Sequence, residues 1–351
     1  MKIAFTADVH LHTEHPERYS ALEDILGQLE AEGIEYLVVA GDLFDKQDPR
    51  FYPDFKRMCR KHSSVRLLII PGNHDPNISD SDFGEENVWV CHEPTPWPIG
   101  DATFLLIPYE HKVSMGDKMA GEAAELAGQE WMLVGHGDYL SGVREPNPHE
   151  PGVYMPLTRA DVDRHGPSQV VLGHIHKATP PEERVVYIGS PHGLDISETG
   201  KRRYLLYDTE SKRFEEKAVR TDYLYFQESF FIFPADDEVV RLQSKIHARM
   251  ESWGLSEGEW DKVRLRVSAG GYARSPSEIH ETLREGFAGL SYYNEESGPV
   301  ADELFPANDS QREKLAKRAL EKLKELDFPL GGKEPDAEDV RLIILQTIYG
   351  T

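Results

Sequence analysis

The sequence predicts an α/β protein in which two β-sheets are flanked by helices, followed by a small α+β module and C-terminal helices. Up to about residue 85, apolar runs that end in polar residues alternate with helical patterns. From residue 86 onward, short strand-like runs follow one another, and the character of the chain changes again near residue 222. Strands that alternate with helices are typical of sheets covered by crossover helices, which sets the fold class.

The first 85 residues read as strand, helix, strand, helix, strand. The runs KIAFTADVH, IEYLVVAGD and VRLLIIPGNHD are almost continuously apolar, and each ends in Asp, Asn or His. Between the first two runs, apolar residues in 16–33 recur at helical spacing, with Pro16 at the start and Gly33 as a C-cap. FYPDFKRMCRKH is the expected second helix.

A second sheet is expected after residue 86. The segments NVWVCH, TFLLIP, WMLVGHG, QVVLGHIH, RVVYIGSP and RRYLLYD read as its short strands. Residues 141–167 are rich in Pro, Gly and His, and we expect them to form a long surface loop. Loops of that length in a compact domain tend to border a site.

The change near residue 222 marks an expected domain boundary, since a single core rarely grows past about 250 to 300 residues and the chain has 351. We expect a main domain over 1–221, a small α+β domain over 222–306 in βαββ-like order, and two helices within 307–351. In the last helix, AEDVRLIILQTIYG, the apolar face is broad. That face suits either a partner groove or packing on its own domain.

Composition excludes several classes of protein. Charged residues make up 29% of the chain, and no apolar run approaches the roughly 18 to 20 residues of a membrane span, so we expect a cytoplasmic protein with no membrane partner. The two cysteines, Cys59 and Cys91, cannot form a disulfide framework. The net charge of −23 argues against a protein that coats DNA, although divalent ions in a compact site would supply local positive charge for a phosphate substrate.

Polar side chains gather at five of the expected strand ends. They are Asp8 and His10, Asp42, Asn73 and His74, His136, and His174 and His176. Strand ends of this kind carry the ligand sites of open α/β sheets, and carboxylate oxygens mixed with imidazoles suit a pair of first-row divalent ions such as manganese, iron or zinc. A carboxylate such as Asp42 can bridge two ions, and a bridging hydroxide can then attack a phosphodiester. His12 and His15, just past the first strand end, are expected to be solvated.

In this order, DVH, GDLFD, GNHD, GH and GHIH resemble the calcineurin-like metallophosphoesterase superfamily. Within it, GDLFD and GHIHKA, with the later VVYIGSPHGLDISETGKRRYLLYD, resemble the SbcD family of DNA double-strand-break repair nucleases. The resemblance covers about residues 1–210. It implies a two-sheet β-sandwich, a catalytic domain over 1–221, a capping domain over 222–306, and two divalent ions, manganese first, with iron, zinc or magnesium as alternatives. It also implies a DNA substrate and an SMC-like coiled-coil ATPase partner of the SbcC type, bound through 307–351, and it allows a homodimer.

The resemblance also implies a role for each residue of the motifs. One ion takes Asp8, His10 and His176, the other takes Asn73, His136 and His174, and Asp42 bridges the two. His74 would face the scissile phosphate as transition-state stabiliser or general acid, with Asp75 orienting it. His192 is a candidate substrate-binding residue. Archaeal and eukaryotic members often carry a His three residues after the bridging Asp, where this chain, like bacterial members, has Asp45.

Three functions compete at this point. The first is a metal-dependent exonuclease or endonuclease subunit of an SbcCD-like repair complex, favoured by the capping module and the GSPHGLDISE stretch. The second is a phosphomonoesterase, or a cyclic-nucleotide or small-molecule phosphodiesterase, favoured by the acidity of the chain. The third is a catalytically silent metal-binding subunit, which the intact set of predicted ligands together with His74 disfavours.

Overall fold

The protein is described here as a computed structural model that covers residues 1–141, 152–307, 310–325 and 337–349. The chain divides into two compact units, Met1–Tyr223 and Leu224–Thr351. The division falls two residues after the boundary expected from the sequence. Each unit is described by itself.

Six strands of the first unit form one sheet in the order β13-β12-β1-β2-β3-β4. These strands are β1 (Lys2–Thr6), β2 (Tyr36–Ala40), β3 (Arg66–Ile70), β4 (Val88–Val90), β12 (Arg203–Asp208) and β13 (Arg213–Ala218). The strands β1 to β4 run parallel, whereas β12 pairs antiparallel with β1, and β13 with β12. The segments that form β4 and β12 were expected in the second sheet, and that expectation is wrong.

Five strands form the second sheet in the order β11-β10-β7-β6-β5. They are β5 (Thr95–Ile99), β6 (Ala102–Ile107), β7 (Met132–His136), β10 (Gln169–Gly173) and β11 (Val185–Tyr187). All neighbours run parallel except the hairpin of β5 and β6. The carboxyl ends of β7 and β10 therefore lie at the same edge of this sheet.

The two sheets share one apolar core. Side chains alternate along each strand, so that Phe5 and Val38 face the second sheet while Ala4 and Leu37 face the helices on the outer side. From the second sheet, Phe104 contributes to the core between the sheets and is fully buried. The predicted two-sheet sandwich flanked by helices is therefore confirmed.

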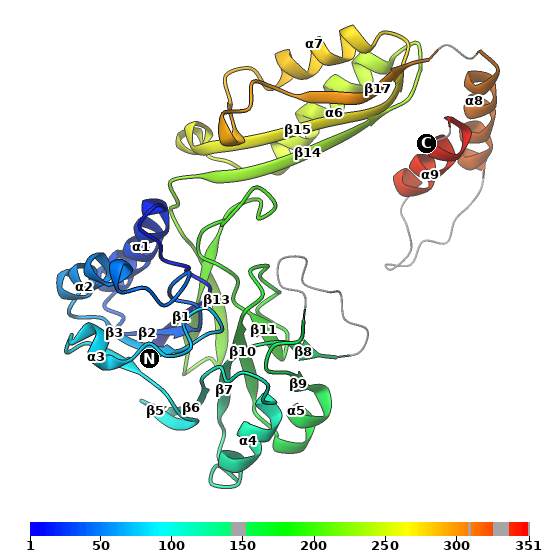
Figure 1. Ribbon diagram of the computed structural model, residues 1–351. Coiled ribbons are helices and arrows are strands. Elements are labelled where there is room, and N and C mark those ends of the chain that lie inside the picture. Colours follow the sequence, from blue (N-terminus) through cyan, green and yellow to red (C-terminus); the bar gives the residue numbers. More distant parts are fainter. Residues whose placement is uncertain (142–151, 308–309, 326–336, 350–351) are drawn as a thin grey trace. The chain divides into compact units, whose positions relative to one another are not determined.

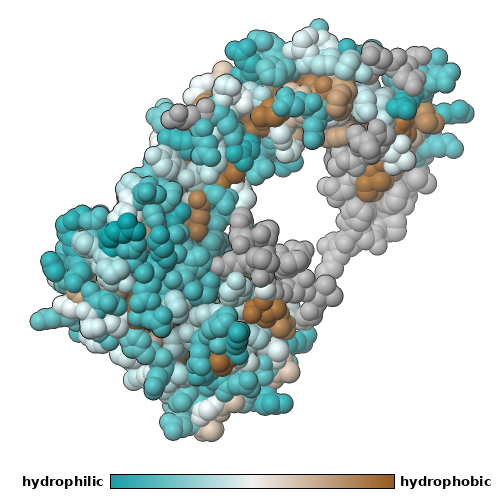
Figure 2. All heavy atoms as spheres, in the orientation of Figure 1, coloured by the Kyte–Doolittle hydropathy of each residue, from teal (hydrophilic) through white to brown (hydrophobic). Residues whose placement is uncertain are grey.

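Three helices cover the outer face of the first sheet, and two cover the second (Figure 1). They are α1 (Pro16–Glu32), α2 (Tyr52–Lys61), α3 (Asp80–Phe83), α4 (Met115–Ala123) and α5 (Arg159–His165). The first helix ends as predicted, because Gly33 adopts φ 68° and donates its N–H to the carbonyls of Glu30 and Leu29. The face of this unit seen in Figure 2 is covered mainly by hydrophilic side chains.

The segment 141–167 is not one long loop. Residues 142–151 lie outside the described part of the chain. After them, β9 (Leu157–Thr158) pairs with β8 (Tyr139–Leu140), and the helix α5 follows directly. Thr158 and Asp161 form a capping box at the start of α5. That pair was the sequence signal for a helix in a stretch with little apolar periodicity.

The second unit begins with a parallel sheet in which β15 (Val263–Ala273) is central. It pairs with β14 (Leu224–Ile232), β16 (Ser291–Tyr292) and β17 (Val300–Pro306), all in parallel register. Helices α6 (Glu238–Ser252) and α7 (Pro276–Gly286) pack on one face of this sheet. Because both helices act as crossovers between parallel strands, and β17 follows β16, the order is βαβαββ rather than the expected βαββ.

Two C-terminal helices, α8 (Ser310–Glu325) and α9 (Ala337–Tyr349), pack together within this unit. Leu345 and Tyr349 are 1% and 2% exposed and cluster with Phe231 and Tyr272 of the sheet. Part of the apolar face of α9 is thus used inside its own unit. In the described part of the chain, no helix has the length and apolar character needed to cross a lipid bilayer.

Candidate metal centre

The carboxyl ends of strands from both sheets meet at one edge of the sandwich. Asp8 and His10 follow β1, Asp42 follows β2, and Asn73 and His74 follow β3. His136 is the last residue of β7, and His174 and His176 follow β10. The structure brings all of these predicted site residues together, as the distances below show.

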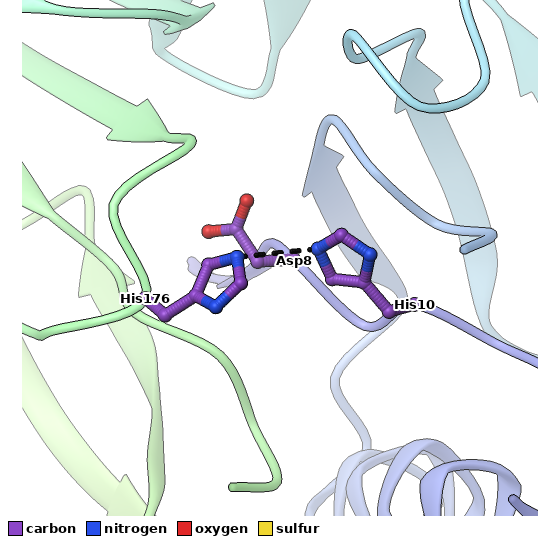
Figure 3. Close-up of side chains that lie close together, drawn as sticks. All are labelled: Asp8, His10 and His176. Atoms are coloured by element: carbon purple, nitrogen blue, oxygen red, sulfur yellow. Dashed lines mark hydrogen bonds between the residues drawn. The ribbon is translucent and has the colours of Figure 1, made fainter. Parts of the chain in front are cut away.

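The first group consists of Asp8, His10 and His176, whose candidate ligand atoms lie within 4.8 Å of one another (Figure 3). The two imidazoles point toward each other, and their Nε2 atoms are 3.2 Å apart. One carboxylate oxygen of Asp8, Oδ1, accepts the N–H of His174 at 2.8 Å. The other, Oδ2, is buried without a hydrogen-bond partner among the described residues, and a buried carboxylate oxygen of this kind fits a metal ligand.

The second group is centred on the amide oxygen of Asn73. This Oδ1 atom lies 2.9 Å from Nε2 of His136 and 3.1 Å from Nδ1 of His174. The rings of His136 and His174 are buried and lie edge to face, with centroids 5.4 Å apart. One oxygen and two nitrogens therefore converge from three strand ends.

Asp42 belongs to both groups. Its Oδ2 atom lies 3.7 Å from Nε2 of His10 in the first group and 3.2 Å from Nε2 of His136 in the second. Its Oδ1 atom accepts the backbone N–H of His74 at 2.9 Å, which fixes the orientation of the carboxylate. The residue is 1% exposed. A single oxygen is thus directed at both halves of the site.

The spacing of these atoms fits divalent ions. Two ligands about 2.1 Å from one ion, at tetrahedral or octahedral angles, lie about 3.0 to 3.4 Å apart. Four of the donor pairs, His10–His176, Asn73–His136, Asn73–His174 and Asp42–His136, are 2.9 to 3.2 Å apart and close to that range, whereas the Asp42–His10 pair is wider at 3.7 Å. Two carboxylates, an amide and four imidazoles are the hard and borderline donors that first-row divalent ions prefer.

Hydrogen bonds on the far ring nitrogens select the tautomers of two histidines. His136 donates from Nδ1 to the carbonyl oxygen of Ala40 at 2.9 Å, which leaves the lone pair on Nε2. His176 donates from Nδ1 to Oε1 of Glu198 at 2.7 Å, with the same result. Both Nε2 atoms face the centre of the site. This arrangement of an imidazole between an acceptor and an ion is typical of metal-binding histidines.

Glu198 was not predicted from the sequence. It is held in turn by the hydroxyl of Ser190 at 2.9 Å, the N–H of Leu194 at 3.2 Å and the guanidinium of Arg202. Burial alone would raise its pKa, but the hydrogen bond to His176, together with Arg202, lowers the pKa to about 2. The only sequence signal was an acid four residues before a basic one, which is common on protein surfaces.

Burial and the neighbouring imidazoles shift the pKa values of Asp8 and Asp42 in opposite directions. Burial raises the pKa of Asp8 to about 6. Burial acts on Asp42 in the same sense, but the neighbouring imidazoles of His136 and His10 outweigh it and hold the pKa of Asp42 below its usual range. For His136, burial favours the neutral ring, whereas the carboxylate of Asp42 raises the pKa to about 10. The site therefore attracts positive charge to its centre.

The backbone is strained at the same positions. Among the described residues, eight non-glycine residues have positive φ, and four of them are Asp8 at 52°, His10 at 50°, Asp42 at 49° and His174 at 88°. Such conformations are unfavourable for side chains other than Gly, although Asp and His tolerate them better than most. Strain of this kind gathers where a site over-determines the chain.

Two glycines of the motifs are required for steric reasons. A Cβ atom at Gly41, where φ is 89°, would overlap the imidazole of His136. A Cβ atom at Gly72 would overlap the carboxylate of Asp42. The glycines beside the strand ends are therefore needed because a partner side chain occupies the space, and not only because the chain turns there.

Asp75 does not orient His74 as expected. Its carboxylate is fully buried and accepts the N–H groups of Gly72 at 2.8 Å and Phe44 at 3.0 Å. The Nδ1 atom of His74 lies 2.7 Å from the carbonyl oxygen of Asp45 instead. Asp75 thus ties the two loops together, and the acceptor for His74 is a backbone carbonyl, which no sequence motif can display.

His192 is also placed differently from the expectation. Its side chain is buried, at 1% exposure, and its Nδ1 contacts the carbonyl of Gly193. A ring covered by protein in this way does not line an open substrate groove. His12 and His15 belong to none of the candidate metal groups in the described residues, and their rings pack at 5.5 Å from each other.

Comparison with known proteins agrees with this geometry. The family model described as calcineurin-like phosphoesterase matches residues 1–178, which is half of the chain. The chain belongs to the calcineurin-like phosphoesterase family. Its members are metal-dependent phosphoesterases, and the fold and the oxygen and nitrogen donors gathered at this edge agree with that activity.

Among individual proteins, the uncharacterized metallophosphoesterase YhaO of Bacillus subtilis is 25% identical over 206 residues, which is 54% of this chain and 48% of that protein. The chain thus spans about half the length of this curated relative. Two solved structures are more distant. The protein TT1561 of Thermus thermophilus is 15% identical with a TM-score of 0.41, covering 62% of this chain and 99% of that one. An archaeal phosphodiesterase is 16% identical with a TM-score of 0.34, covering 62% and 100%.

Replacing Gly41 by Ala tests the packing of the site. The added Cβ must displace His136 and also adopt a positive φ, so the substitution should destabilise the fold by about 1 to 3 kcal/mol from strain alone. Bound metal per protein, measured by elemental analysis after dialysis, should fall as well. Gly121→Ala in α4 is the matched control, since a Cβ there meets nothing within 4 Å. Equal metal content in the two variants would contradict the close approach described here.

Replacing Glu198 by Gln tests the role of the hydrogen bond to His176. The amide has the same shape but can turn an N–H toward the ring, so the tautomer is no longer fixed. We expect metal affinity to fall by about 10- to 100-fold, as for other residues that support a metal-binding histidine. Titration of the metal-depleted protein by calorimetry measures this, with Glu182→Gln at an exposed position as the control. An unchanged affinity would show that Glu198 serves only the local fold.

Proposed function

We propose that this protein is a dinuclear-metal-dependent phosphodiesterase that cleaves DNA, and that it works as the nuclease subunit of an SbcCD-like repair complex. The observation that carries the dinuclear part is the position of Asp42 Oδ2, which lies within 4 Å of a histidine nitrogen in each group. The DNA substrate is supported by motifs within residues 1–210 that resemble those of the SbcD family and by the separate α+β unit that follows. Manganese is the proposed ion.

In this proposal Asp8, His10 and His176 would hold one ion, Asn73, His136 and His174 would hold the other, and Asp42 would be shared between them. When bound, a pair of divalent ions supplies Lewis-acid activation of water and of the attacked phosphate. The ions also supply the positive charge that a chain of net charge −23 lacks for a phosphate substrate.

His74 is the proposed acid for the leaving oxygen. Its ring stands edge to face with that of His10, with centroids 4.7 Å apart, so it borders the metal groups. Because Nδ1 is directed at the carbonyl of Asp45, Nε2 is the ring atom that would carry a proton to the leaving group. The ring is half-buried, which gives a substrate access to one side of it.

An SMC-like coiled-coil ATPase is the proposed partner, and the C-terminal helices are its proposed docking site. Leu345 and Tyr349 are occupied within their own unit, so the partner would contact the outer side of the helix pair. Leu315 of α8 and Ile343 of α9 are 55% and 56% exposed and offer apolar contacts there.

The negative charge of the chain favours a second candidate, a phosphomonoesterase or small-molecule phosphodiesterase that uses the same metal centre. A substrate panel separates the candidates. It consists of single-stranded DNA, duplex DNA ends, bis-nitrophenyl phosphate and nitrophenyl phosphate, each with manganese and with chelator. We expect manganese-dependent cleavage of DNA and of the diester. Turnover of the monoester alone would overturn the nuclease proposal, and no turnover of any substrate would indicate a silent metal-binding subunit.

Replacing His74 by Ala tests its proposed role. We expect turnover of DNA to fall by about a hundredfold or more, the usual scale for losing an acid catalyst, while metal content stays the same. Asp42→Asn is the contrasting variant, because removing a shared carboxylate should lower the metal content itself. Elemental analysis and steady-state kinetics on both variants give the comparison. Wild-type turnover in His74→Ala would remove this histidine from the mechanism.

A further inference from the structure

Arg18 is a buried arginine in the first turn of α1. The residue is 6% exposed, although arginines are almost never buried unless paired. Its Nη1 atom donates two hydrogen bonds, to the carbonyl oxygen of His10 at 2.8 Å and to Oδ1 of Asp45 at 3.0 Å. The guanidinium thus joins the loop after β1 to the loop after β2.

Asp45 carries this connection on to His74. Its carboxylate accepts from Arg18, and its backbone carbonyl lies 2.7 Å from Nδ1 of His74. Its own N–H donates to the carbonyl of Leu11 at 3.2 Å. The carbonyl that contacts the His74 ring is therefore held through the Asp45 N–H, which bonds to Leu11, and through the Asp45 carboxylate, which bonds to Arg18 at 3.0 Å and lies 3.8 Å from Nδ1 of His10.

Other contacts fix the neighbouring residues but do not hold this carbonyl. Phe44 is anchored by Asp75, and the carboxylate of Asp42 is anchored by the N–H of His74. These bonds hold the metal edge and the backbone of His74. The direction of the His74 ring depends in addition on the Asp45 carbonyl, and Arg18 is the charged group that hydrogen-bonds the Asp45 carboxylate, while Nδ1 of His10 lies farther away at 3.8 Å.

We propose that Arg18 is a positioning residue for His74, acting through Asp45. The inference rests on the proposed role of His74 in the reaction. Arg18 presents its donors from a rigid planar group, so it can bond the His10 carbonyl and the Asp45 carboxylate from one atom while the helix holds its stem. Without it, the Asp45 carboxylate loses its hydrogen-bonded partner and keeps only the more distant Nδ1 of His10, at 3.8 Å, among the described residues, so the Asp45 carbonyl holds the His74 ring less firmly.

A double-mutant cycle of Arg18→Met and His74→Ala tests this proposal on the full-length protein with manganese and a DNA substrate. Misplacing a catalytic group by about 1 Å can cost about a hundredfold in rate. We therefore expect Arg18→Met alone to lower kcat by about 10- to 100-fold, with KM and metal content close to wild type. In the His74→Ala background the same substitution should lower kcat by less than about twofold, since the group that Arg18 positions is then absent.

The controls separate positioning from a structural role. Arg57→Met removes an exposed arginine that pairs with Asp54, and it should leave kcat unchanged in both backgrounds. Arg18→Lys, which keeps the charge, should recover part of the lost kcat. If Arg18→Met does not fold, Asp45→Ala takes its place in the cycle, because the Asp45 side chain is 38% exposed and tolerates replacement better.

Three outcomes would overturn the proposal. The first is that the fold-losses in kcat of the two single variants multiply in the double variant. The second is a wild-type kcat in Arg18→Met. The third is a loss of metal in Arg18→Met that accounts for its lower activity. The proposed function is judged separately. If the wild-type protein cleaves no phosphodiester, the function fails, whereas multiplying losses in an active enzyme overturn only the part assigned to Arg18.

Discussion

The carboxylate of Asp42 lies where the two sheets of the sandwich meet, and the geometry of the metal edge depends on it. Its Oδ2 atom faces a histidine from the first sheet and another from the second. Gly72 leaves room for that carboxylate, and Gly41 leaves room for His136 beside it. A shift of one sheet against the other by a single residue would separate these groups. The apolar core between the sheets and the polar cluster at their edge thus specify the same register.

The buried polar residues at the metal edge lower the stability of the fold, and metal binding compensates for this loss. Asp8, His10, Asp42 and His174 are buried there at 0 to 2% exposure, in backbone conformations that non-glycine residues avoid. Buried ionisable groups are unfavourable unless they are paired or bind metal. Because metal binds the folded arrangement and not the unfolded chain, its binding free energy adds to the stability of the fold. The same residues therefore connect the stability of the sandwich to its chemistry.

The residues of the metal site could be predicted from the sequence, whereas the strand pairing and the hydrogen bonds around the site could not. Asp8, Asp42 and His136 were recognisable because each follows or ends an apolar strand, so a polar residue there stands out. The sequence did not show which sheet each strand belongs to. The strand β12 is as apolar as a strand of the second sheet, and only its pairing with β1 places it in the first sheet. The partner of His74 was hidden because a backbone carbonyl carries no sequence signature. Glu198 looked like any surface acid until its contact with His176 was visible.

The position of β12 has a consequence for how the protein is made. The strand that precedes Asp8 and His10 lies between β2 and β12, and its antiparallel partner, Leu205 opposite Phe5, emerges about two hundred residues later. Until then β1 remains an open edge on the nascent chain, and contacts this distant in sequence form slowly. The ribosome must therefore deliver almost the whole first unit before its first strand is covered, and the metal edge is completed while the second unit, Leu224–Thr351, is still to be synthesised.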